Sequence, residues 1–292
     1  MKAIIIGAGI AGPVMAIQLK YLGYDVEIFE SRLENNNSEG AFLGITPNGL
    51  NILKMFLSLD KLKEEYTSGS MRFYNQKGRQ IAKFSSDYQK EKYGCETIQI
   101  KRAHLNKIIQ SAAEEAGIKI HFQKKCVGIE AMQTHIQAEF EDGSNEYGDI
   151  LIACDGTFST IRKKIFPTAA KPTYTKNIST GGYARLPELP APLDCINMTF
   201  GERGFFAYSV SNQGEIWWFN NYYRENEPSK YETQTTLKEE IKNRLLDIHK
   251  NDDPVFSRII NASKEIIAYP VYDIPRLENW YKEMPPMRHH HI

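Results

Sequence analysis

Three glycines near the N-terminus have the spacing of a phosphate-binding turn. Gly7, Gly9 and Gly12 follow the apolar run 2–6 and precede apolar residues that recur at helical spacing up to Gly23. Gly7 permits a tight turn, Gly9 lets a pyrophosphate approach the backbone, and Gly12 allows the helix to pack closely on the strand. The helix N-terminus adds N–H groups and a partial positive charge. The pattern therefore predicts a nucleotide site.

A carboxylate is placed to bind the sugar of the same nucleotide. Residues 25–30 are predicted to form the second strand, and it ends in Glu30, 23 residues after Gly7. An acid at this position accepts hydrogen bonds from a ribose 2′-hydroxyl. The alternatives are a solvated carboxylate at a strand end and a structural glycine turn. The order of strand, turn, helix and strand favours the nucleotide site.

A second acid is predicted to face the same crevice. Residues 148–153 indicate a buried strand that ends in Asp155-Gly156, and a helix is predicted to start soon after. Ligands of open α/β sheets bind at the carboxyl ends of the strands, so Asp155 is expected near Gly9. An aspartate that caps a helix or a turn is the alternative.

The composition indicates a soluble α/β protein with two domains. The chain has 292 residues, 41% of them hydrophobic, and equal numbers (36 each) of basic and acidic residues, which does not favour nucleic acid or an anionic membrane as a partner. No apolar run has the length of a membrane span, and the predicted first strand leaves no room for a signal peptide. The four scattered cysteines are typical of reduced thiols, so a cytoplasmic location without a disulfide framework or zinc site is expected.

The second half of the chain is predicted to be mainly antiparallel. Residues 179–185, 195–200, 204–210 and 215–220 indicate strands in meander order, and an amphipathic helix over 237–248 is expected to cover them. Aromatic side chains are dense in these strands, which suits a flat apolar ligand, although packing of the sheet is the simpler explanation for any single one. These residues are Phe200, Phe205, Phe206, Tyr208, Trp217, Trp218 and Phe219.

Four segments together resemble the class A FAD-dependent monooxygenases, the para-hydroxybenzoate hydroxylase-like flavoproteins. They are the glycine motif, Glu30-Ser31-Arg32, Arg102-Ala-His-Leu105, and the segment 153–162 with Asp155-Gly156 and Arg162. The last segment distinguishes this family from ordinary NAD-binding proteins. Cys154 is a small departure from the family pattern. The resemblance extends to about Trp280.

The resemblance implies an α/β fold with two domains. A Rossmann-like FAD-binding domain is expected over 1–72 and 98–170, and a mainly antiparallel substrate domain over 73–97 and 171–270. The family's Gly-Asp motif and final helix do not follow Trp280, so 271–292 is expected to be a truncated return segment. The run His289-His290-His291 is interpreted as the remnant of an expression tag or as out-of-frame translation rather than as a metal site.

The resemblance also implies which residues bind FAD. The glycines would hold the pyrophosphate, Glu30 the adenosine ribose, Arg102 the ribityl or phosphate side, and Asp155 the pyrophosphate region. The full set of implied cofactor-binding residues is Gly7, Gly9, Ala11, Gly12, Glu30, Ser31, Arg32, Arg102, Val127 and Asp155.

The implied activity is hydroxylation of an aromatic or polycyclic small molecule, with NAD(P)H as reductant and molecular oxygen as co-substrate. The flavin carries the difficult chemistry, so no side chain is assigned as a catalytic acid, base or nucleophile, and no metal is expected. Two alternatives stay open: a related flavin-dependent reductase, and a non-catalytic remnant with weak or no FAD binding. A halogenase is not favoured because Trp217-Trp218 does not match the motif of those enzymes.

Overall fold

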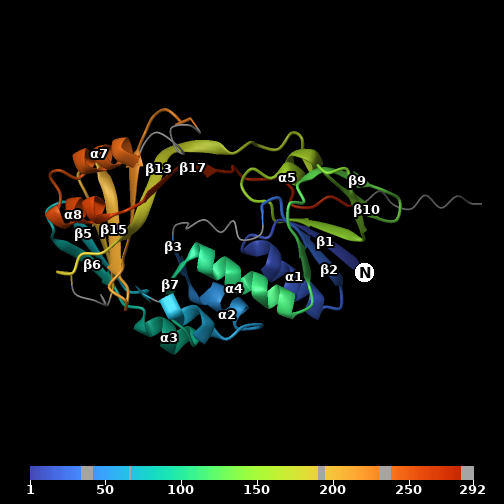
Figure 1. The fold of residues 1–292 in the computed structure, drawn as a ribbon, viewed down its shortest axis with the longest axis horizontal. Helices are drawn as coiled ribbons and strands as arrows, with labels where there is room; N and C mark the ends of the chain where they lie inside the picture. The colour runs from blue at the N-terminus through green and yellow to red at the C-terminus, as the bar shows by residue number, and fades with distance from the viewer. Residues whose placement is uncertain (34–41, 66, 190–194, 230–237, 284–292) are drawn as a thin grey trace, which may run out of the picture. The chain divides into compact units, whose positions relative to one another are not determined.

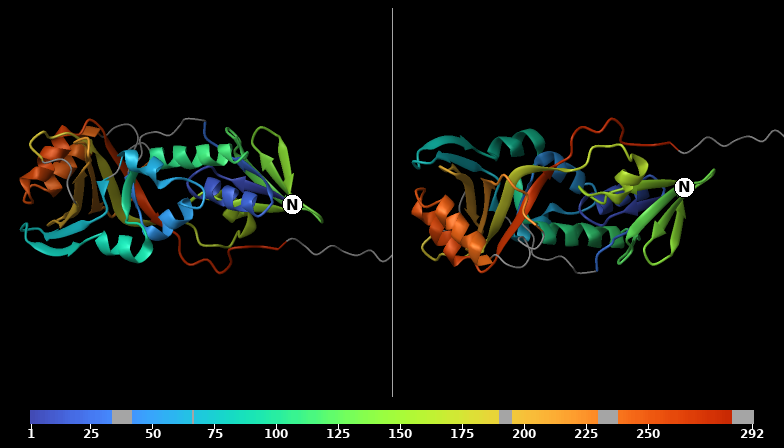
Figure 2. Two further views of the ribbon diagram at one scale, coloured as in Figure 1. Left: turned by 90° about the horizontal axis from the view of Figure 1, so that it is seen from below. Right: turned by 90° about the horizontal axis from the view of Figure 1, so that it is seen from above.

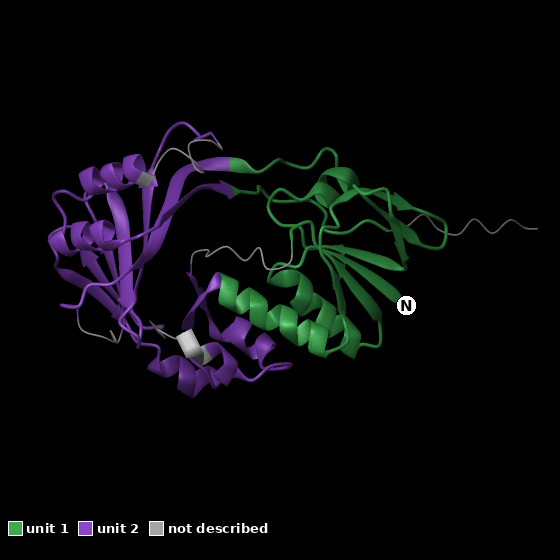
Figure 3. Ribbon diagram, in the orientation of Figure 1, with its two compact units in different colours: residues 1–38, 103–173, 273–292 green, residues 39–102, 174–272 purple. Residues whose placement is uncertain are grey.

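The chain divides into two compact units. In the computed structural model, residues 1–33, 42–65, 67–189, 195–229 and 238–283 are described. Unit 1 comprises residues 1–38, 103–173 and 273–292, and unit 2 comprises residues 39–102 and 174–272 (Figure 3). Segments 39–72 and 98–102 thus lie in unit 2, whereas the sequence groups them with FAD binding. That functional division stays a prediction, as do the truncated segment and the cytoplasmic location. The histidine run lies outside the described residues.

Unit 1 is built on a four-stranded parallel sheet. Its order is β12-β1-β2-β8, so β1 has β12 on one side and β2 on the other. The strands are β1 (Lys2–Ile6), β2 (Asp25–Phe29), β8 (Lys119–His121) and β12 (Ile150–Ala153). The other elements are α1 (Ala11–Tyr21), α4 (Arg102–Glu115), α5 (Thr160–Ile165) and the antiparallel strands β9 (Cys126–Ala131), β10 (Ile136–Phe140) and β11 (Asn145–Gly148).

Both faces of the parallel sheet are covered. Ile4 and Ile6 pack with Phe140 of β10 and Ile161 of α5 on one face. Because side chains alternate along a strand, the buried Ile5 points to the other face, where α1 begins. Figure 1 and the left-hand view in Figure 2 show α1 and α4 as neighbours. Burial on both faces explains why β1 is a continuous apolar run.

Unit 2 is built on a seven-stranded sheet with the order β17-β13-β16-β15-β14-β5-β6. Its strands are β5 (Met71–Asn75), β6 (Gln80–Phe84), β13 (Thr173–Ala184), β14 (Ile196–Phe200), β15 (Gly204–Val210), β16 (Ile216–Tyr223) and β17 (Ile266–Asp273). Beside it lie the sheet β3 (Phe42–Ile45), β7 (Ile98–Lys101) and β4 (Thr67–Ser68), with α2 (Pro47–Leu53), the 3₁₀ helix η1 (Leu59–Glu65) and α3 (Asp87–Tyr93).

The predicted meander is correct for three of its four strands. β14, β15 and β16 are antiparallel neighbours in chain order, but β13 pairs with β16 instead of β14. The other edge of β14 pairs in parallel with β5, which forms an antiparallel hairpin with β6. A period-two pattern determines which face a side chain takes, but it does not determine which strand lies beside it. The meander prediction was therefore wrong at β13.

Two helices cover one face of this large sheet. They are α7 (Lys238–Ile248), which confirms the predicted amphipathic helix, and α8 (Pro254–Ala262). Leu245 of α7 and Phe256 of α8 pack with Phe206 and Trp218 of the sheet. Asp253 caps α8 by accepting a hydrogen bond from Val255 N at 2.9 Å. In the described part of the chain, no helix is long and apolar enough to cross a membrane.

Candidate functional site

The predicted nucleotide residues leave the parallel sheet at one edge. Ile6 pairs with Phe29 on one side and with Ala153 on the other, so Gly7, Glu30 and Cys154 all follow the last strand residues at the same carboxyl edge. The order of strands reverses at β1, since β2 lies on one side and β12 on the other. A crevice at such a reversal is where open α/β sheets bind ligands.

The glycine turn has the geometry that its spacing predicts. Gly7 has φ +106°, and a Cβ there would lie 2.5 Å from the carbonyl oxygen of Cys154. A Cβ at Gly12 would lie 1.9 Å from the carbonyl oxygen of Gly7, so α1 packs directly on the turn. A Cβ at Gly9 would meet no atom within 4 Å. Gly7 and Gly12 are thus required by close contacts within the protein, whereas Gly9 borders open space.

The N-terminus of α1 supports binding of a phosphate beside Gly9. The helix begins at Ala11, directly after the turn, and its N-cap residue Ile10 makes no side-chain capping bond. No acidic residue lies in its first turn. The backbone N–H groups and the positive end of the helix dipole therefore favour a bound anion, with no carboxylate of the helix's own first turn to compete with it.

Glu30 is a buried carboxylate joined to the turn. Its exposed fraction is 7%, and its Oε2 accepts a hydrogen bond from Ala8 N at 2.8 Å. Its Oε1 accepts from Arg32 N at 2.9 Å and from Ser31 Oγ at 3.2 Å. Each carboxylate oxygen can accept two bonds, so Oε2 can still receive a ribose hydroxyl. Glu30 thus also organises the glycine turn, a role that the spacing does not indicate.

Asp155 has one oxygen in use and one that is buried without a partner. Its Oδ2 accepts hydrogen bonds from Thr160 N at 2.7 Å and Ile161 N at 3.3 Å, which caps α5. Its Oδ1 is buried and makes no hydrogen bond to any described residue. The alternative that Asp155 caps a helix is therefore correct for Oδ2 but does not account for Oδ1. A buried acceptor without a partner costs free energy, and a hydroxyl donor from a ligand would relieve that cost.

For the remaining predicted cofactor residues, the structure shows no hydrogen bond between a described side chain and the glycine turn. The Arg32 side chain is 64% exposed, and its Nε lies 3.6 Å from Glu30 Oε1. Val127 is 37% exposed on β9, next to Cys126. Arg102 is the first residue of α4 and ends the first of the two segments that form unit 2. The cofactor roles of these residues and of Ser31 and Ala11 stay predictions.

Gln110 is a contact of the turn that sequence reasoning missed. It lies on α4, and its Nε2 donates a hydrogen bond of 2.7 Å to the carbonyl oxygen of Ala8. The only signal in the sequence was a polar residue within an amphipathic helix. That signal is common on helix surfaces and names no partner.

Two thiols in unit 1 stay protonated at neutral pH. Burial, with the charge of Asp155 as a further cause, raises the pKa of Cys154 to about 11. Burial also raises the pKa of Cys126 to about 11, although a backbone hydrogen bond with Gly128 opposes this. Neither is a ready nucleophile, because the thiolate is the reactive form.

A row of aromatic rings lies on the face of the large sheet opposite α8. The Phe205 ring lies 5.6 Å from that of Phe219, and Phe42 of β3 lies 5.9 Å from Phe219 and 5.5 Å from Trp217. Phe200 continues the row, 5.4 Å from Phe205. We call these five residues the aromatic row. Its members Phe42, Phe200, Phe205 and Phe219 are partly exposed in the structure.

One charged pair borders the aromatic row. Lys101 Nζ lies 5.7 Å from the centre of the Trp217 ring and 3.0 Å from Glu215 Oε2. Trp217 Nε1 donates to the same carboxylate oxygen at 2.8 Å. The pair holds the indole in a fixed orientation.

The aromatic residues of the sheet serve two different purposes. Phe206 and Trp218 have exposed fractions of 0% and stack on one another with 5.4 Å between ring centres, on the side of α8. They belong to the core, as the simpler explanation predicted. Phe200, Phe205 and Phe219 take the other face. Adjacent residues of one strand thus separate into core and candidate ligand surface.

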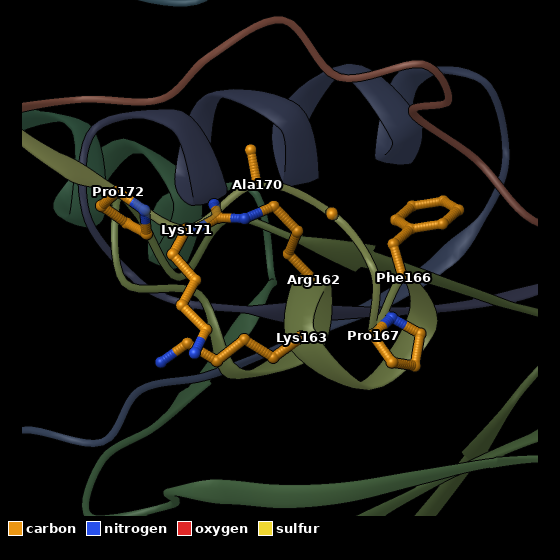
Figure 4. A pocket seen from close by; sticks show the side chains of 8 residues that line it. Arg162, Lys163, Phe166, Pro167, Ala170, Lys171 and Pro172 are labelled. Carbon is orange, nitrogen blue, oxygen red and sulfur yellow. The ribbon is translucent and has the colours of Figure 1, made fainter.

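A shallow basic hollow lies elsewhere on unit 1. Its side chains come from α5 and the segment that follows it, including Arg162, Lys163, Phe166 and Lys171 (Figure 4). The hollow has an empty volume of about 290 Å³ and includes none of the predicted cofactor residues. It is therefore separate from the glycine turn.

Known proteins with similar sequences are flavin enzymes. Residues 1–264 match the family described as FAD binding domain. The FAD-dependent monooxygenase ntnA of Nectria sp is 28% identical over 269 residues, which cover 86% of this chain and 35% of that protein. The FAD-dependent urate hydroxylase of Klebsiella pneumoniae is 26% identical over 75% of this chain and 57% of that protein. The chain thus spans between about a third and somewhat over half of these curated relatives.

Solved structures show the same fold. HpxO of Klebsiella pneumoniae, solved with FAD and uric acid, matches with a TM-score of 0.81 and 23% identity over 94% of this chain and 68% of that chain. The 2,6-dihydroxypyridine-3-hydroxylase of Arthrobacter nicotinovorans matches with a TM-score of 0.73 and 16% identity over 93% and 72%. These matches confirm the expected mixed α/β fold. Because the family match covers most of the sequence, the chain belongs to the class A FAD-dependent monooxygenases, whose cofactor is FAD.

Proposed function

We propose that this chain binds FAD at the carboxyl edge of the unit 1 sheet and acts as the catalytic region of a monooxygenase. One observation carries the proposal: three features lie at one edge of one sheet. They are the open space at Gly9, the start of α1 without a side-chain cap, and Asp155 Oδ1, which no described residue hydrogen-bonds. An elongated ligand with phosphates and several hydroxyls satisfies all three. FAD has both groups, so the residues present fit the cofactor.

The residues of unit 1 would bind and orient the cofactor. The N-terminus of α1 would hold the pyrophosphate, Glu30 Oε2 would accept a ribose hydroxyl, and Asp155 Oδ1 would accept a further hydroxyl. When bound, FAD supplies the redox and oxygen-activating chemistry, with NAD(P)H as the reductant that the family implies. The protein need not supply a nucleophile, in agreement with the protonated Cys126 and Cys154 thiols.

We further propose that the aromatic row binds a planar aromatic or polycyclic substrate. Partly exposed rings offer stacking surface and exclude water from a flat molecule. The indole of Trp217, fixed by Glu215, would give this surface a constant shape. The urate hydroxylases and the pyridine hydroxylase among the similar proteins are named for planar ring substrates, which supports this class of substrate.

Flavin content is the first test of this proposal. The protein is purified, incubated with FAD, separated from unbound FAD and denatured, and the released flavin is measured by fluorescence and mass. We expect FAD in near-stoichiometric amount. Absence of FAD after incubation would refute the proposed function and favour the non-catalytic alternative.

NAD(P)H oxidation then separates the two enzyme classes. A monooxygenase consumes NAD(P)H faster with a suitable planar substrate and transfers one oxygen atom from ¹⁸O₂ to it, as seen by mass spectrometry. A flavin reductase consumes NAD(P)H without labelling the substrate. Oxidation without label across a panel of planar aromatic compounds would contradict the monooxygenase assignment.

A further inference from the structure

Ala8, inside the glycine turn, is held at both of its backbone polar groups. Its N–H donates to Glu30 Oε2 at 2.8 Å, and its carbonyl oxygen accepts from Gln110 Nε2 at 2.7 Å. Glu30 follows β2, and Gln110 lies on α4, 102 residues after Ala8. Ala8 is 2% exposed, so water does not compete strongly for either bond. Two elements distant in sequence thus fix one residue of the turn.

The bond from Gln110 also determines the direction of the next N–H. In a trans peptide the carbonyl and the N–H of one plane point in opposite directions. Because Gln110 draws the Ala8 carbonyl toward α4, the N–H of Gly9 is directed away from α4. Gly9 is the residue whose missing Cβ leaves open space.

We propose that Gln110 is a positioning residue for the pyrophosphate of FAD. It holds the Ala8–Gly9 peptide in the orientation that presents an N–H, instead of a carbonyl oxygen, to the phosphate oxygens. This inference rests on the proposed function, because it assumes that FAD binds at this turn. It adds a residue on α4 that acts through the peptide of the turn.

The turn needs such an anchor because glycine does not restrict its own peptide. Gly9 can adopt many backbone conformations, so the Ala8–Gly9 plane could rotate without a steric penalty from a side chain. In the reversed orientation the carbonyl dipole would repel the pyrophosphate. An amide side chain suits the position because it is a neutral donor, whereas an ionised carboxylate would repel the Ala8 carbonyl.

The test compares dissociation constants for FAD, measured by quenching of flavin fluorescence. Gln110→Leu removes the donor at similar size, and Lys107→Gln, an exposed position one turn earlier on α4, is the matched control. We expect Gln110→Leu to weaken FAD binding about tenfold or more, because the Ala8 carbonyl loses the bond that favours this peptide orientation. The control should bind FAD like the wild type.

A second ligand separates positioning from general damage. ADP contains the pyrophosphate and adenosine does not, so Gln110→Leu should weaken ADP binding by a similar factor and adenosine binding much less. A merely structural role would weaken both ligands equally and lower the unfolding temperature of the ligand-free protein. Equal weakening, or FAD binding unchanged in Gln110→Leu, would overturn the inference.

A pH series gives a reading that does not depend on the leucine variant. In Gln110→Glu the carboxylate cannot donate above its pKa, but its protonated form can. The ratio of the FAD dissociation constants of this variant and the wild type should therefore fall as the pH is lowered from about 7 to about 4, through the ordinary pKa of a glutamate. A constant ratio would refute the role of the donor. If the wild type binds neither FAD nor ADP, the proposed function and this inference fail together, whereas wild-type binding with unaffected variants refutes this inference alone.

Discussion

Alanine at Gly9 and alanine at Gly12 are predicted to have opposite effects on the stability of the ligand-free protein. At Gly9 the new Cβ meets no atom within 4 Å, and the residue is not among those with positive φ. Alanine there restricts the unfolded chain without straining the folded one, which raises the free energy of unfolding by about 0.4–1 kcal/mol.

At Gly12 the same substitution places a Cβ against rigid backbone. The contact with the Gly7 carbonyl oxygen would be 1.9 Å and must open to at least 3.0 Å, so α1 and the turn have to separate. Overpacking against backbone costs about 3 kcal/mol, the upper part of its usual range. Better helix propensity returns about 1 kcal/mol, so we expect a net loss of about 2 kcal/mol.

In Gly9→Ala, the affinity for FAD and the free energy of unfolding are expected to change in opposite directions. In Gly9→Ala the Cβ occupies the space through which the pyrophosphate approaches, so the dissociation constant should rise about tenfold or more, a loss of about 1.4 kcal/mol. Urea unfolding of the ligand-free protein and FAD titration measure the two effects separately. A Gly9→Ala protein that binds FAD like the wild type would refute the placement of the pyrophosphate. A Gly12→Ala protein of unchanged stability would refute the packing argument.

Three further predictions concern other parts of the chain. Asp155→Asn should keep the stability of the protein, since its amide oxygen can still cap α5, whereas Asp155→Ala should lower the free energy of unfolding by about 1 kcal/mol, both by urea titration; equal stability of the two variants would contradict the cap. Burial lowers the pKa of His249 below its usual 6.5, despite the opposing hydrogen bond from its Nδ1 to Asp252, so the unfolded chain binds a proton more readily than the folded one. The contribution of His249 to stability is therefore fully present above about pH 6.5, the pKa in the unfolded chain, and is lost as the pH falls toward the lower pKa of the folded state. His249→Gln should reduce this loss in urea titrations between about pH 7.5 and 5. An unchanged pH dependence would refute the assignment. Trp218→Ala should cost about 3–5 kcal/mol of stability because the ring is fully buried, whereas Phe219→Ala, on the aromatic row, should mainly raise the KM for a planar substrate; a KM unaffected by Phe219→Ala would exclude the row as the substrate surface.

The sequence by itself predicted the local structure around the glycine turn closely. The apolar run at β1, the spacing of Gly7, Gly9 and Gly12, and the acid after β2 are local signals, because a strand, a turn and a helix of fixed geometry follow directly from adjacent residues. The fold class and the family could therefore be read from residue types and order. The close packing at Gly12 was also predictable from its position in that turn, whereas the role of Gly9 in phosphate binding stays a prediction.

Only the tertiary structure decided which distant residues meet. Gln110 reaches Ala8 across 102 positions, and no local pattern indicates such a contact. Similarly, alternation along β15 and β16 predicts two faces but not which face α7 and α8 cover, so Phe206 and Trp218 could not be distinguished from Phe205 and Phe219. The pairing of β13 with β16 has the same origin, because neighbours in a sheet are chosen by packing over the whole unit rather than by the residues of one strand. Local chemistry thus determined the turn, and long-range packing determined what holds that turn in place.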